Sequence, residues 1–279
     1  MKRRELLLQM EKRLREGGVE ESRGEARWLC EAAFSVSQSE WLLTRERECS
    51  EAEQAAAEAL LLRRLSGEPV QYILGKWPFL SLELFVGPGV LIPRPETEQL
   101  CEAAAKDLCA GDRVLDLCAG TGAVGLGICS LKAGVSADCV ELYEEASDYL
   151  CRNIARYRYP VRAIRFDVFE KPDARFGLYE RIVSNPPYNA ESELAVLPRE
   201  LSFEPQTALC GGEDGLVFYR AILENWLCLL KTGGEIWFEI GEDQGAALRN
   251  MLSERGLSDV RILKDQSGLD RIATARKED

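Results

Sequence analysis

The sequence predicts a small bundle of helices followed by an α/β domain with a mainly parallel sheet. Up to about Gly75, apolar side chains recur at helical spacing, whereas from Gly111 onward short apolar runs alternate with helical segments. Such alternation is typical of a parallel sheet covered by helices on both faces. We therefore expect residues 1–75 to form a helical domain, 76–92 a β-hairpin linker and 93–279 the α/β domain.

About four short helices are expected in the first part. Three segments match the capping box, in which a serine oxygen and a carboxylate satisfy free amides at a helix start. Apolar stripes at helical spacing follow the first and the third of them. Nothing here resembles a catalytic group, so we expect a docking or packing role. The three segments are Ser22-x-x-Glu25, Ser37-x-x-Glu40 and Ser50-x-x-Glu53.

Strands of the second part can be placed from their apolar runs. The alternation of apolar and polar residues from Phe79 to Val86 predicts a pair of strands, with Gly87-Pro88-Gly89 as the turn between the two strands. In parallel sheets, ligands bind beyond the carboxyl ends of the strands. We therefore look for a site in the loops after the first four strands of the sheet. The expected strands are residues 113–118, 137–142, 161–167, 179–185, 234–240, 260–265 and 271–276.

Composition favours a cytoplasmic protein. No apolar run approaches the roughly 18 residues of a membrane span. Glu11 and later charges interrupt the N-terminal leucines, so we expect an amphipathic helix there rather than a signal peptide. The ten cysteines lie in apolar segments without a Cys-x-x-Cys pair, which favours buried free thiols in a reducing compartment.

Charge and the lack of histidine exclude several kinds of chemistry. The 279 residues contain no histidine, which removes imidazole bases, Ser-His or Cys-His nucleophile pairs and His-ligated metals. We expect no metal. The net charge of −12 argues against extended nucleic-acid binding, because such proteins usually present a basic face. We expect a monomer with no stable nucleic-acid partner and no membrane association.

A glycine loop follows the first strand of the sheet. Gly120-x-Gly122-x-x-Gly125 allows a ligand to approach the backbone at a helix start, and Glu141 ends the second strand where an acid would bind ribose hydroxyls. Taken alone, these features also fit an NAD-dependent dehydrogenase. That enzyme class remains a competing hypothesis at this point.

Two carboxylates favour S-adenosylmethionine over a dinucleotide. Asp116 lies inside the first strand, where a buried carboxylate needs a partner, and the amino group of S-adenosylmethionine is a natural one, directly or through water. Asp167 and Val168 follow the third strand and can flank an adenine, although Asp167 fits a simple turn equally well. Together these loops predict a Class I (Rossmann-like) methyltransferase that uses S-adenosylmethionine.

The fourth strand ends in Asn185-Pro186-Pro187-Tyr188. The Asn185 side-chain carbonyl can accept one N–H of a substrate NH₂ group, and a main-chain carbonyl near Pro186 can accept the other. Proline fixes φ and has no N–H, so the loop is stiff and offers carbonyls without competing donors. Tyr188 can lie against a flat amide. This tetrad resembles that of methyltransferases acting on planar, conjugated nitrogen, which need no histidine because the methylated nitrogen loses its proton easily.

Three segments make the resemblance more specific. "LIPRPETE", "SNPPY" and "FEPQTALCGGEDGL" resemble the peptide chain release factor N(5)-glutamine methyltransferases, the HemK/PrmC family, and the similarity covers nearly the whole chain. It implies methyl transfer to the side-chain amide of the Gly-Gly-Gln glutamine of class 1 peptide chain release factors, which modulates translation termination. The helical domain is then expected to help hold that protein substrate.

The resemblance also implies residue roles. A run of five residues lines the cofactor, Glu141 binds its ribose, and Asp167 with Val168 flanks its adenine. The tetrad from Asn185 to Tyr188 binds the glutamine, with Asn185 also near the methyl donor. The five cofactor-lining residues are Cys118, Ala119, Gly120, Thr121 and Gly122.

The chain departs from the common family pattern at three places. Cys118-Ala119 stand where glycine and a small hydroxyl residue are usual, Glu141 replaces a commoner aspartate, and Val168 replaces a frequent aromatic residue. These departures affect cofactor affinity and remove no catalytic group. Pro93 and Pro95 either stiffen the active-site wall or, for Pro95-Glu96, begin a helix.

Other functions remain open from the sequence. Glutamine methylation of a ribosomal protein uses the same tetrad, and so does adenine methylation of DNA, although this acidic chain has no obvious target-recognition domain. A catalytically idle binding module is the alternative outside the enzymes. The intact Asn185 and the glycines argue against it.

Overall fold

The computed structural model describes residues 1–278. The chain forms two compact units. Residues 1–76 and 198–203 make up one, which we call the helical unit, and residues 77–197 with those from Glu204 onward make up the other, which we call the sheet unit. Most of the expected hairpin thus belongs to the sheet unit, and the three-part division of the chain remains a prediction.

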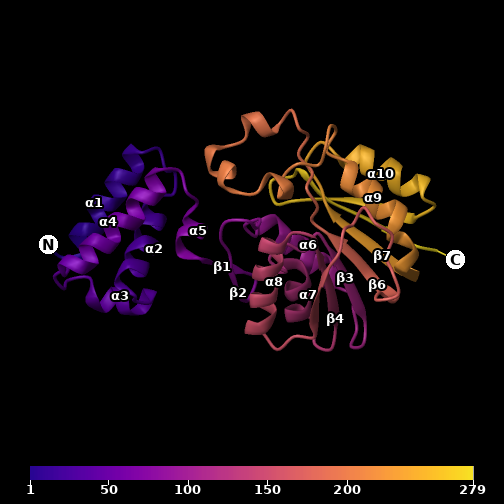
Figure 1. Ribbon diagram of the computed structural model, residues 1–279, viewed down its shortest axis with the longest axis horizontal. Helices are drawn as coiled ribbons and strands as arrows, with labels where there is room; N and C mark the ends of the chain where they lie inside the picture. The colour runs from indigo at the N-terminus through magenta and orange to yellow at the C-terminus, as the bar shows by residue number, and fades with distance from the viewer. Residues whose placement is uncertain (279) are drawn as a thin grey trace. The chain divides into compact units, whose positions relative to one another are not determined.

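Five helices form the N-terminal part of the helical unit (Figure 1). The first, second and fourth pack on one another around side chains such as Met10, Leu29 and Leu61, which are fully buried. The helical pattern is as expected, with one short helix more than the four anticipated. The five are α1 (Arg3–Glu16), α2 (Ser22–Phe34), α3 (Gln38–Thr44), α4 (Glu51–Leu65) and α5 (Val70–Leu74).

Two of the three predicted capping boxes are confirmed. Ser37 caps α3 and Ser50 caps α4, each with its partner glutamate returning a hydrogen bond. The prediction for Ser22 and Glu25 is wrong, because Ser22 is already inside α2 and makes no cap. Glu25 instead turns into the core and pairs with the buried guanidinium of Arg64. Leaving the buried charge of Arg64 unpaired would cost more free energy than leaving the start of α2 without a side-chain cap.

A two-stranded hairpin opens the sheet unit, with β1 at Lys76–Phe79 and β2 at Leu82–Phe85. Its turn is Leu80-Ser81, with Leu80 at a φ of 51°. The prediction that Gly87-Pro88-Gly89 joins the two strands is therefore wrong. These residues follow the hairpin, and a Cβ on Gly87 would lie 2.2 Å from the Tyr149 hydroxyl. Any larger residue there would require the Tyr149 side chain to shift.

The main sheet has seven strands in the order β5-β4-β3-β6-β7-β9-β8. Its first five strands run parallel, and β9 is antiparallel to both neighbours. The order reverses between β3 and β6, which creates a switch point where ligands bind in such folds. The strands are β3 (Arg113–Leu117), β4 (Ser136–Glu141), β5 (Val161–Arg165), β6 (Tyr179–Ser184), β7 (Leu230–Glu239), β8 (Ser258–Lys264) and β9 (Asp270–Arg276).

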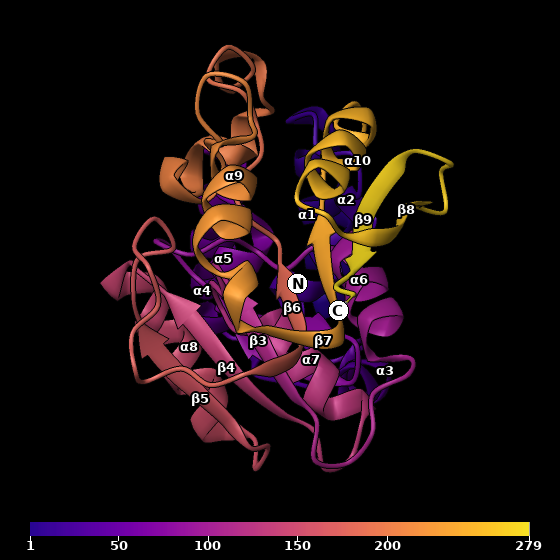
Figure 2. The same cartoon turned by 90° about the vertical axis from the view of Figure 1, so that its right-hand side faces the viewer.

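Helices cover both faces of this sheet, as predicted. One hydrophobic cluster joins the sheet to α6, α7 and α8, and a second joins the opposite face to α9 and α10. Figure 2 shows α9 and α10 on one side and α6 and α7 on the other. The chain is thus a three-layer α/β fold in this unit. The helices are α6 (Pro95–Ala105), α7 (Ala123–Leu131), α8 (Glu144–Arg156), α9 (Val217–Asn225) and α10 (Gly245–Glu254).

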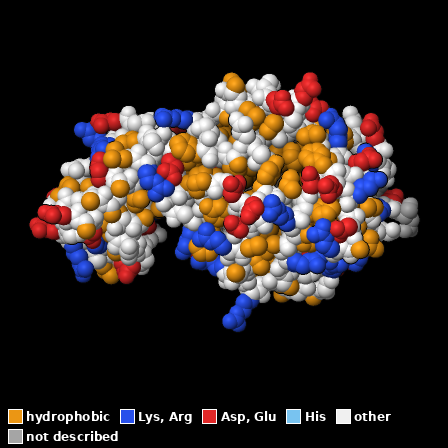
Figure 3. All heavy atoms as spheres, viewed as in Figure 1, with side chains coloured by type: hydrophobic (Ala, Val, Ile, Leu, Met, Phe, Trp, Pro, Cys, Tyr) orange, Lys and Arg blue, Asp and Glu red, His pale blue; other side chains and the backbone are white. Residues whose placement is uncertain are grey.

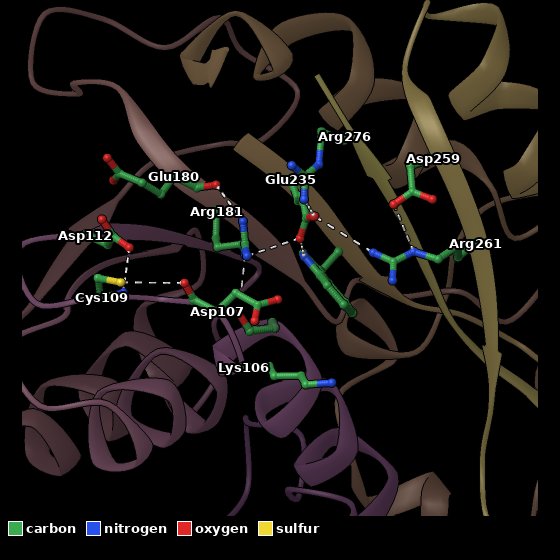
Figure 4. Close-up of polar contacts among 12 residues, drawn as sticks. Lys106, Asp107, Cys109, Asp112, Glu180, Arg181, Glu235, Asp259, Arg261 and Arg276 are labelled. Atoms are coloured by element: carbon green, nitrogen blue, oxygen red, sulfur yellow. Dashed lines mark hydrogen bonds and ion pairs between the residues drawn. The ribbon is translucent and has the colours of Figure 1, made fainter. Parts of the chain in front are cut away.

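An ion-pair cluster stabilises the strands away from their carboxyl ends (Figure 4). Arg181 of β6 and Glu235 of β7 are register partners, and Arg181 Nη2 lies 3.2 Å from Glu235 Oε2. Arg276 donates to the other oxygen of Glu235 at 2.7 Å. Glu235 is buried, so these cations offset the cost of placing its charge in the sheet. This cluster is structural and lies outside the ligand pocket described below.

Charged side chains of both signs are intermixed over the face shown in Figure 3, with hydrophobic side chains between them. The net charge of −12 is therefore a balance of many groups rather than one uniform acidic surface on that face. Among residues 1–278, none of the helices combines the length and apolar composition required to cross a bilayer.

Candidate active site

A pocket lies at the carboxyl edge of the sheet unit. The space between its walls is about 930 Å³, which includes space open to solvent. Its walls come from the loops after β3, β4, β5 and β6, together with Gly89–Pro93 and Pro205–Ala208. The four loops expected from the sequence therefore converge, because the strands that precede them are parallel neighbours.

The glycine loop after β3 forms the floor of the pocket. Gly120 and Gly122 have φ values of 53° and 80°, in the left-handed region that glycine tolerates. Gly122 begins α7, and a Cβ on it would lie 2.5 Å from Leu150 Cδ1. Cys118 also has a positive φ, of 61°, without being a glycine. This cysteine is therefore held in a conformation that costs on the order of 1 kcal/mol.

Asp116 lies beneath this loop rather than in the pocket wall. It is completely buried on β3, and its Oδ2 accepts a hydrogen bond from the Gly125 amide at 2.9 Å. Burial raises its pKa to about 7. Among the described residues Oδ1 has no hydrogen-bond partner. Asp116 is not among the lining residues, and its observed contact with Gly125 positions α7. A contact of Asp116 with the cofactor, directly or through water, remains a prediction.

Glu141 lies at the end of β4, and its carboxylate connects three backbone amides. Oε2 accepts from Gly120 at 2.9 Å, and Oε1 accepts from Leu142 and Tyr143 at 2.9 Å each. Burial raises the pKa of Glu141, and these amides oppose the shift. Each carboxylate oxygen keeps acceptor capacity. The longer side chain, compared with aspartate, thus reaches back to the glycine loop while lining the pocket.

The loop after β5 supplies an apolar wall. Phe166, Val168 and Phe169 line the pocket together with Phe218 of α9, and the rings of Phe169 and Phe218 lie 5.0 Å apart. Asp167 also lines the pocket, while its Oδ1 accepts from the Phe169 amide at 2.9 Å. Asp167 therefore closes a turn of the kind considered from the sequence. The wall offers flat apolar surface beside an acceptor group.

Asn185 follows β6 and lines the pocket beside the glycine loop. Its Nδ2 donates to Thr97 Oγ1 at 3.1 Å, and the Thr97 hydroxyl donates to Glu239 Oε2 at 2.6 Å. Thr97 lies on α6 and Glu239 ends β7, and both are buried. Burial raises the pKa of Glu239 to about 7. The sequence analysis assigned neither residue a role, although Thr97 lies within the "LIPRPETE" segment quoted for the family resemblance. Nothing local distinguishes Glu239 from other glutamates of a strand.

The rest of the tetrad turns partly away from the pocket. Pro187 lines it, whereas Pro186 and Tyr188 are not among its lining residues. The Tyr188 hydroxyl lies 3.5 Å from Glu239 Oε1, and burial raises its pKa. Its main-chain carbonyl accepts from Gln244 Nε2 at 2.9 Å. Contacts of Pro186 and Tyr188 with a substrate therefore remain predictions.

The "CGGEDG" stretch packs behind the tetrad. The Gly211 backbone amide donates to the Asn189 carbonyl at 2.8 Å, and the Asn189 backbone amide donates to the Leu209 carbonyl at 3.0 Å. A Cβ on Gly211 would lie 2.8 Å from the Pro187 carbonyl oxygen, and one on Gly215 would lie 2.3 Å from that of Tyr188. Only glycine lets the two segments approach this closely.

Two further segments quoted for the family resemblance meet in space. Glu204 of "FEPQTAL" is buried, accepts from the Ile92 amide at 2.9 Å and pairs with Arg94 of "LIPRPETE". Pro93 lines the pocket, and Pro95 occupies the first turn of α6. Pro95-Glu96 thus begin a helix, whereas stiffening of the pocket wall by Pro93 and Pro95 remains a prediction. The Glu204 contacts place Pro205, Thr207 and Ala208 on the pocket wall.

Most of the residues expected at the site do line this one pocket. Gly122, Asp116, Pro186 and Tyr188 lie behind its surface. The expected residues that line the pocket are Cys118, Ala119, Gly120, Thr121, Glu141, Asp167, Val168, Asn185 and Pro187. Within residues 1–278, no cluster of three or more His, Cys, Asp or Glu side chains is arranged to hold a metal ion.

The fold and this site define a class of protein. Strand order, glycine loop, the acid after the second sheet strand and the tetrad after the fourth are those of Class I methyltransferases, which use S-adenosylmethionine as methyl donor. Two solved methyltransferases share the fold at 20% identity and a TM-score of 0.53. One, from Pyrococcus furiosus, covers 80% of this chain and 98% of its own, and the other, the T. thermophilus 16S rRNA N2 G1207 methyltransferase, covers 73% and 50%.

Sequence relatives define the particular family. Residues 5–75 match the PrmC N-terminal domain, and residues 96–205 match the methyltransferase small domain. The release factor glutamine methyltransferase of Geobacter sulfurreducens is 35% identical over 94% of this chain and 92% of its own. That of Bordetella pertussis is 37% identical over 89% and 93%. The chain belongs to the release factor glutamine methyltransferases.

Proposed function

We propose that this protein transfers a methyl group from S-adenosylmethionine to the side-chain amide nitrogen of the glutamine in the Gly-Gly-Gln motif of class 1 peptide chain release factors, and so modulates translation termination. Family membership over nearly the whole chain supports the substrate. The observation that carries the chemistry is Asn185, which lines the donor pocket while Thr97 holds its Nδ2.

The pocket fits the proposed donor. Its floor has glycines at positive φ, its rim has the Glu141 carboxylate, and its side wall is the apolar surface of Val168, Phe169 and Phe218. These suit a methionine moiety with its nucleoside linkage, a ribose and an adenine, in that order. When bound, S-adenosylmethionine supplies a methyl group on a positively charged sulfur, open to displacement by a nucleophile.

The chain's own residues prepare the nitrogen. An amide nitrogen shares its lone pair with the carbonyl and is a poor nucleophile. The Asn185 Oδ1 accepts one substrate N–H, and a carbonyl of the Pro186-Pro187 corner accepts the other, so that the nitrogen is oriented for in-line attack. The Tyr188 ring contacts the amide face. No histidine is needed, because the nitrogen becomes acidic on methylation and releases a proton to solvent.

A labelling experiment tests this function. Purified class 1 release factor is incubated with the protein and methyl-labelled S-adenosylmethionine, and the modified peptide is mapped by mass spectrometry. We expect one methyl group on the Gly-Gly-Gln glutamine and none on a factor in which that glutamine is replaced by asparagine. Label on another residue, or transfer only to a ribosomal protein in a parallel reaction, would overturn the assignment.

Partners and location follow from this function. We place the protein in the cytoplasm, where release factors are made, and all ten cysteines are unpaired in the described chain, which suits a reducing compartment. We propose that it acts as a monomer without a stable nucleic-acid partner. The helical unit is proposed to hold the release factor.

A further inference from the structure

The Asn185 amide belongs to a line of side-chain hydrogen bonds that leads into the interior of the sheet unit. Asn185 Nδ2 donates to Thr97 Oγ1 at 3.1 Å, and Thr97 donates to Glu239 Oε2 at 2.6 Å. Tyr188 lies 3.5 Å from the other Glu239 oxygen. Thr97 is 3% exposed and Glu239 is 1% exposed. Thr97 itself lines the pocket beside Asn185, and the line ends at Glu239, which is buried on β7 and is not a lining residue.

Above the raised pKa of Glu239, which is about 7, its carboxyl group is ionised, and each bond in this line then has only one possible direction. A carboxylate can only accept, so the single hydroxyl hydrogen of Thr97 must point to Glu239. The Thr97 oxygen then faces Asn185 only as an acceptor, and the Asn185 group beside it must be the NH₂. The opposite arrangement would place two oxygen acceptors against each other in a buried site, at a cost of about 1–3 kcal/mol.

The direction of these hydrogen bonds determines which atom of the Asn185 amide faces the substrate. The two ends of an asparagine amide have nearly the same shape, so packing alone does not choose between them. With Nδ2 held by Thr97, Oδ1 is the free end at the pocket. A substrate NH₂ group needs an acceptor there, whereas the NH₂ of Asn185 would face it donor to donor.

We propose that Glu239 and Thr97 are positioning residues, which orient the Asn185 amide so that its carbonyl oxygen receives the substrate carboxamide. The inference rests on the proposed function, because it concerns how the same site selects its substrate. Neither side chain is required to contact the reacting atoms. Their effect passes through Asn185 and is greatest in a buried setting, where hydrogen bonds are stronger and unmatched groups cost more.

Thr97→Val tests the inference with little change of shape. The variant removes the hydroxyl and leaves the Asn185 amide free to turn, so we expect kcat to fall about 10- to 100-fold, with donor affinity by calorimetry unchanged. Thr97→Ser restores the hydroxyl and should recover most of the activity. Thr274→Val is the matched control, since the buried Thr274 hydroxyl has no partner among the described residues and lies outside the pocket.

A second readout distinguishes orientation from a general structural defect. A release factor with glutamate in place of the target glutamine should inhibit the wild type weakly, because Oδ1 faces the carboxylate. In Thr97→Val, and in Glu239→Gln, Asn185 can turn its NH₂ toward that carboxylate. We therefore expect the ratio of the affinity for the glutamine-containing release factor to that for the glutamate-containing one to fall by about tenfold in these variants. This corresponds to roughly 1.4 kcal/mol.

The outcomes separate this inference from the proposed function. Failure of the wild type to methylate the release factor glutamine would contradict the function itself. An active wild type, combined with a Thr97→Val variant of normal kcat and unchanged glutamine preference, would overturn the positioning role alone. Loss of activity in Thr97→Val that Thr97→Ser does not recover would also count against it.

Discussion

Single side chains at the carboxyl edge of the sheet determine what the pocket can bind. Asn185 lines the pocket with its Nδ2 held by Thr97, and Glu141 lines it with a carboxylate held by three backbone amides. Each group is polar, mostly enclosed and held in place by protein partners. A fixed acceptor discriminates by geometry, because it does not reorganise when the substrate arrives.

Replacing Asn185 by alanine should abolish methyl transfer. The substrate loses its amide acceptor, and we expect kcat to fall at least ~100-fold, while the donor still binds because the glycine loop and Glu141 are unchanged. Transfer assays with calorimetry of donor binding check both parts. Asn250→Ala, an exposed asparagine on α10, serves as control. Near-normal turnover of Asn185→Ala would remove the role assigned to this residue.

Glu141→Ala should weaken donor binding by about 1–3 kcal/mol, the cost of leaving hydroxyl groups and loop amides unmatched. Asp148→Ala, on the exposed face of α8, removes a similar charge from a residue that does not line the pocket and should leave affinity unchanged. Isothermal titration calorimetry with S-adenosylmethionine measures both variants. Equal affinity of Glu141→Ala and wild type would mean that the ribose lies elsewhere.

At the level of elements, the position of α7 depends on glycines and on one buried acid. The Gly125 amide donates to Asp116, and Gly125 itself packs against β4, where its missing side chain leaves space for Cys139. The position of the glycine loop therefore depends on contacts with residues of the sheet as well as on its own φ angles. This explains why a glycine is required at a helical position where φ is ordinary.

Gly125→Ala should destabilise the sheet unit by about 1–3 kcal/mol through overpacking, since its Cβ would lie 2.4 Å from Cys139 Sγ. In a Cys139→Ala background the same change should cost less, by about 1 kcal/mol or more. Urea unfolding measures the cycle. Gly24→Ala in α2 has room, with Trp28 Cη2 at 4.0 Å as its nearest neighbour, and should stabilise by about 0.5–1 kcal/mol. Purely additive effects at positions 125 and 139 would contradict this account of the contact.

For the whole molecule, two buried carboxyl groups determine how stability changes with pH. Asp116 and Glu239 have pKa values of about 7, because burial disfavours their charged forms, and Arg271 and Thr97 only partly offset this for Glu239. Their ordinary values are near 4. At these two groups the folded protein therefore binds more protons than the unfolded chain between about pH 4 and 7, so their contribution to the unfolding free energy falls as pH rises through that window.

We accordingly expect the unliganded protein to unfold at higher urea concentration at pH 5.5 than at pH 8, with a difference on the order of a few kcal/mol. Far-UV circular dichroism follows the transition. Asp116→Asn and Glu239→Gln should each reduce the dependence on pH, because each removes one titrating group. A double variant with the full wild-type pH dependence would show that other groups are responsible. Below about pH 4, loss of paired carboxylates such as Asp138, whose pKa Arg162 and Tyr179 lower against the effect of burial, should reverse the trend.

The sequence alone determined most of the strand and helix pattern, the family and nine of the residues that line the pocket. The spacing of hydrophobic residues and the positions of glycines and prolines affect the conformation of neighbouring residues. They can therefore be interpreted without knowledge of the fold. Only the tertiary structure decided that Glu25 pairs with Arg64 instead of capping α2, that the hairpin turns at Leu80, and that Thr97 and Glu239 stand behind Asn185. These outcomes join residues far apart in the chain, and their free energies depend on burial and on strand order, which no local pattern contains.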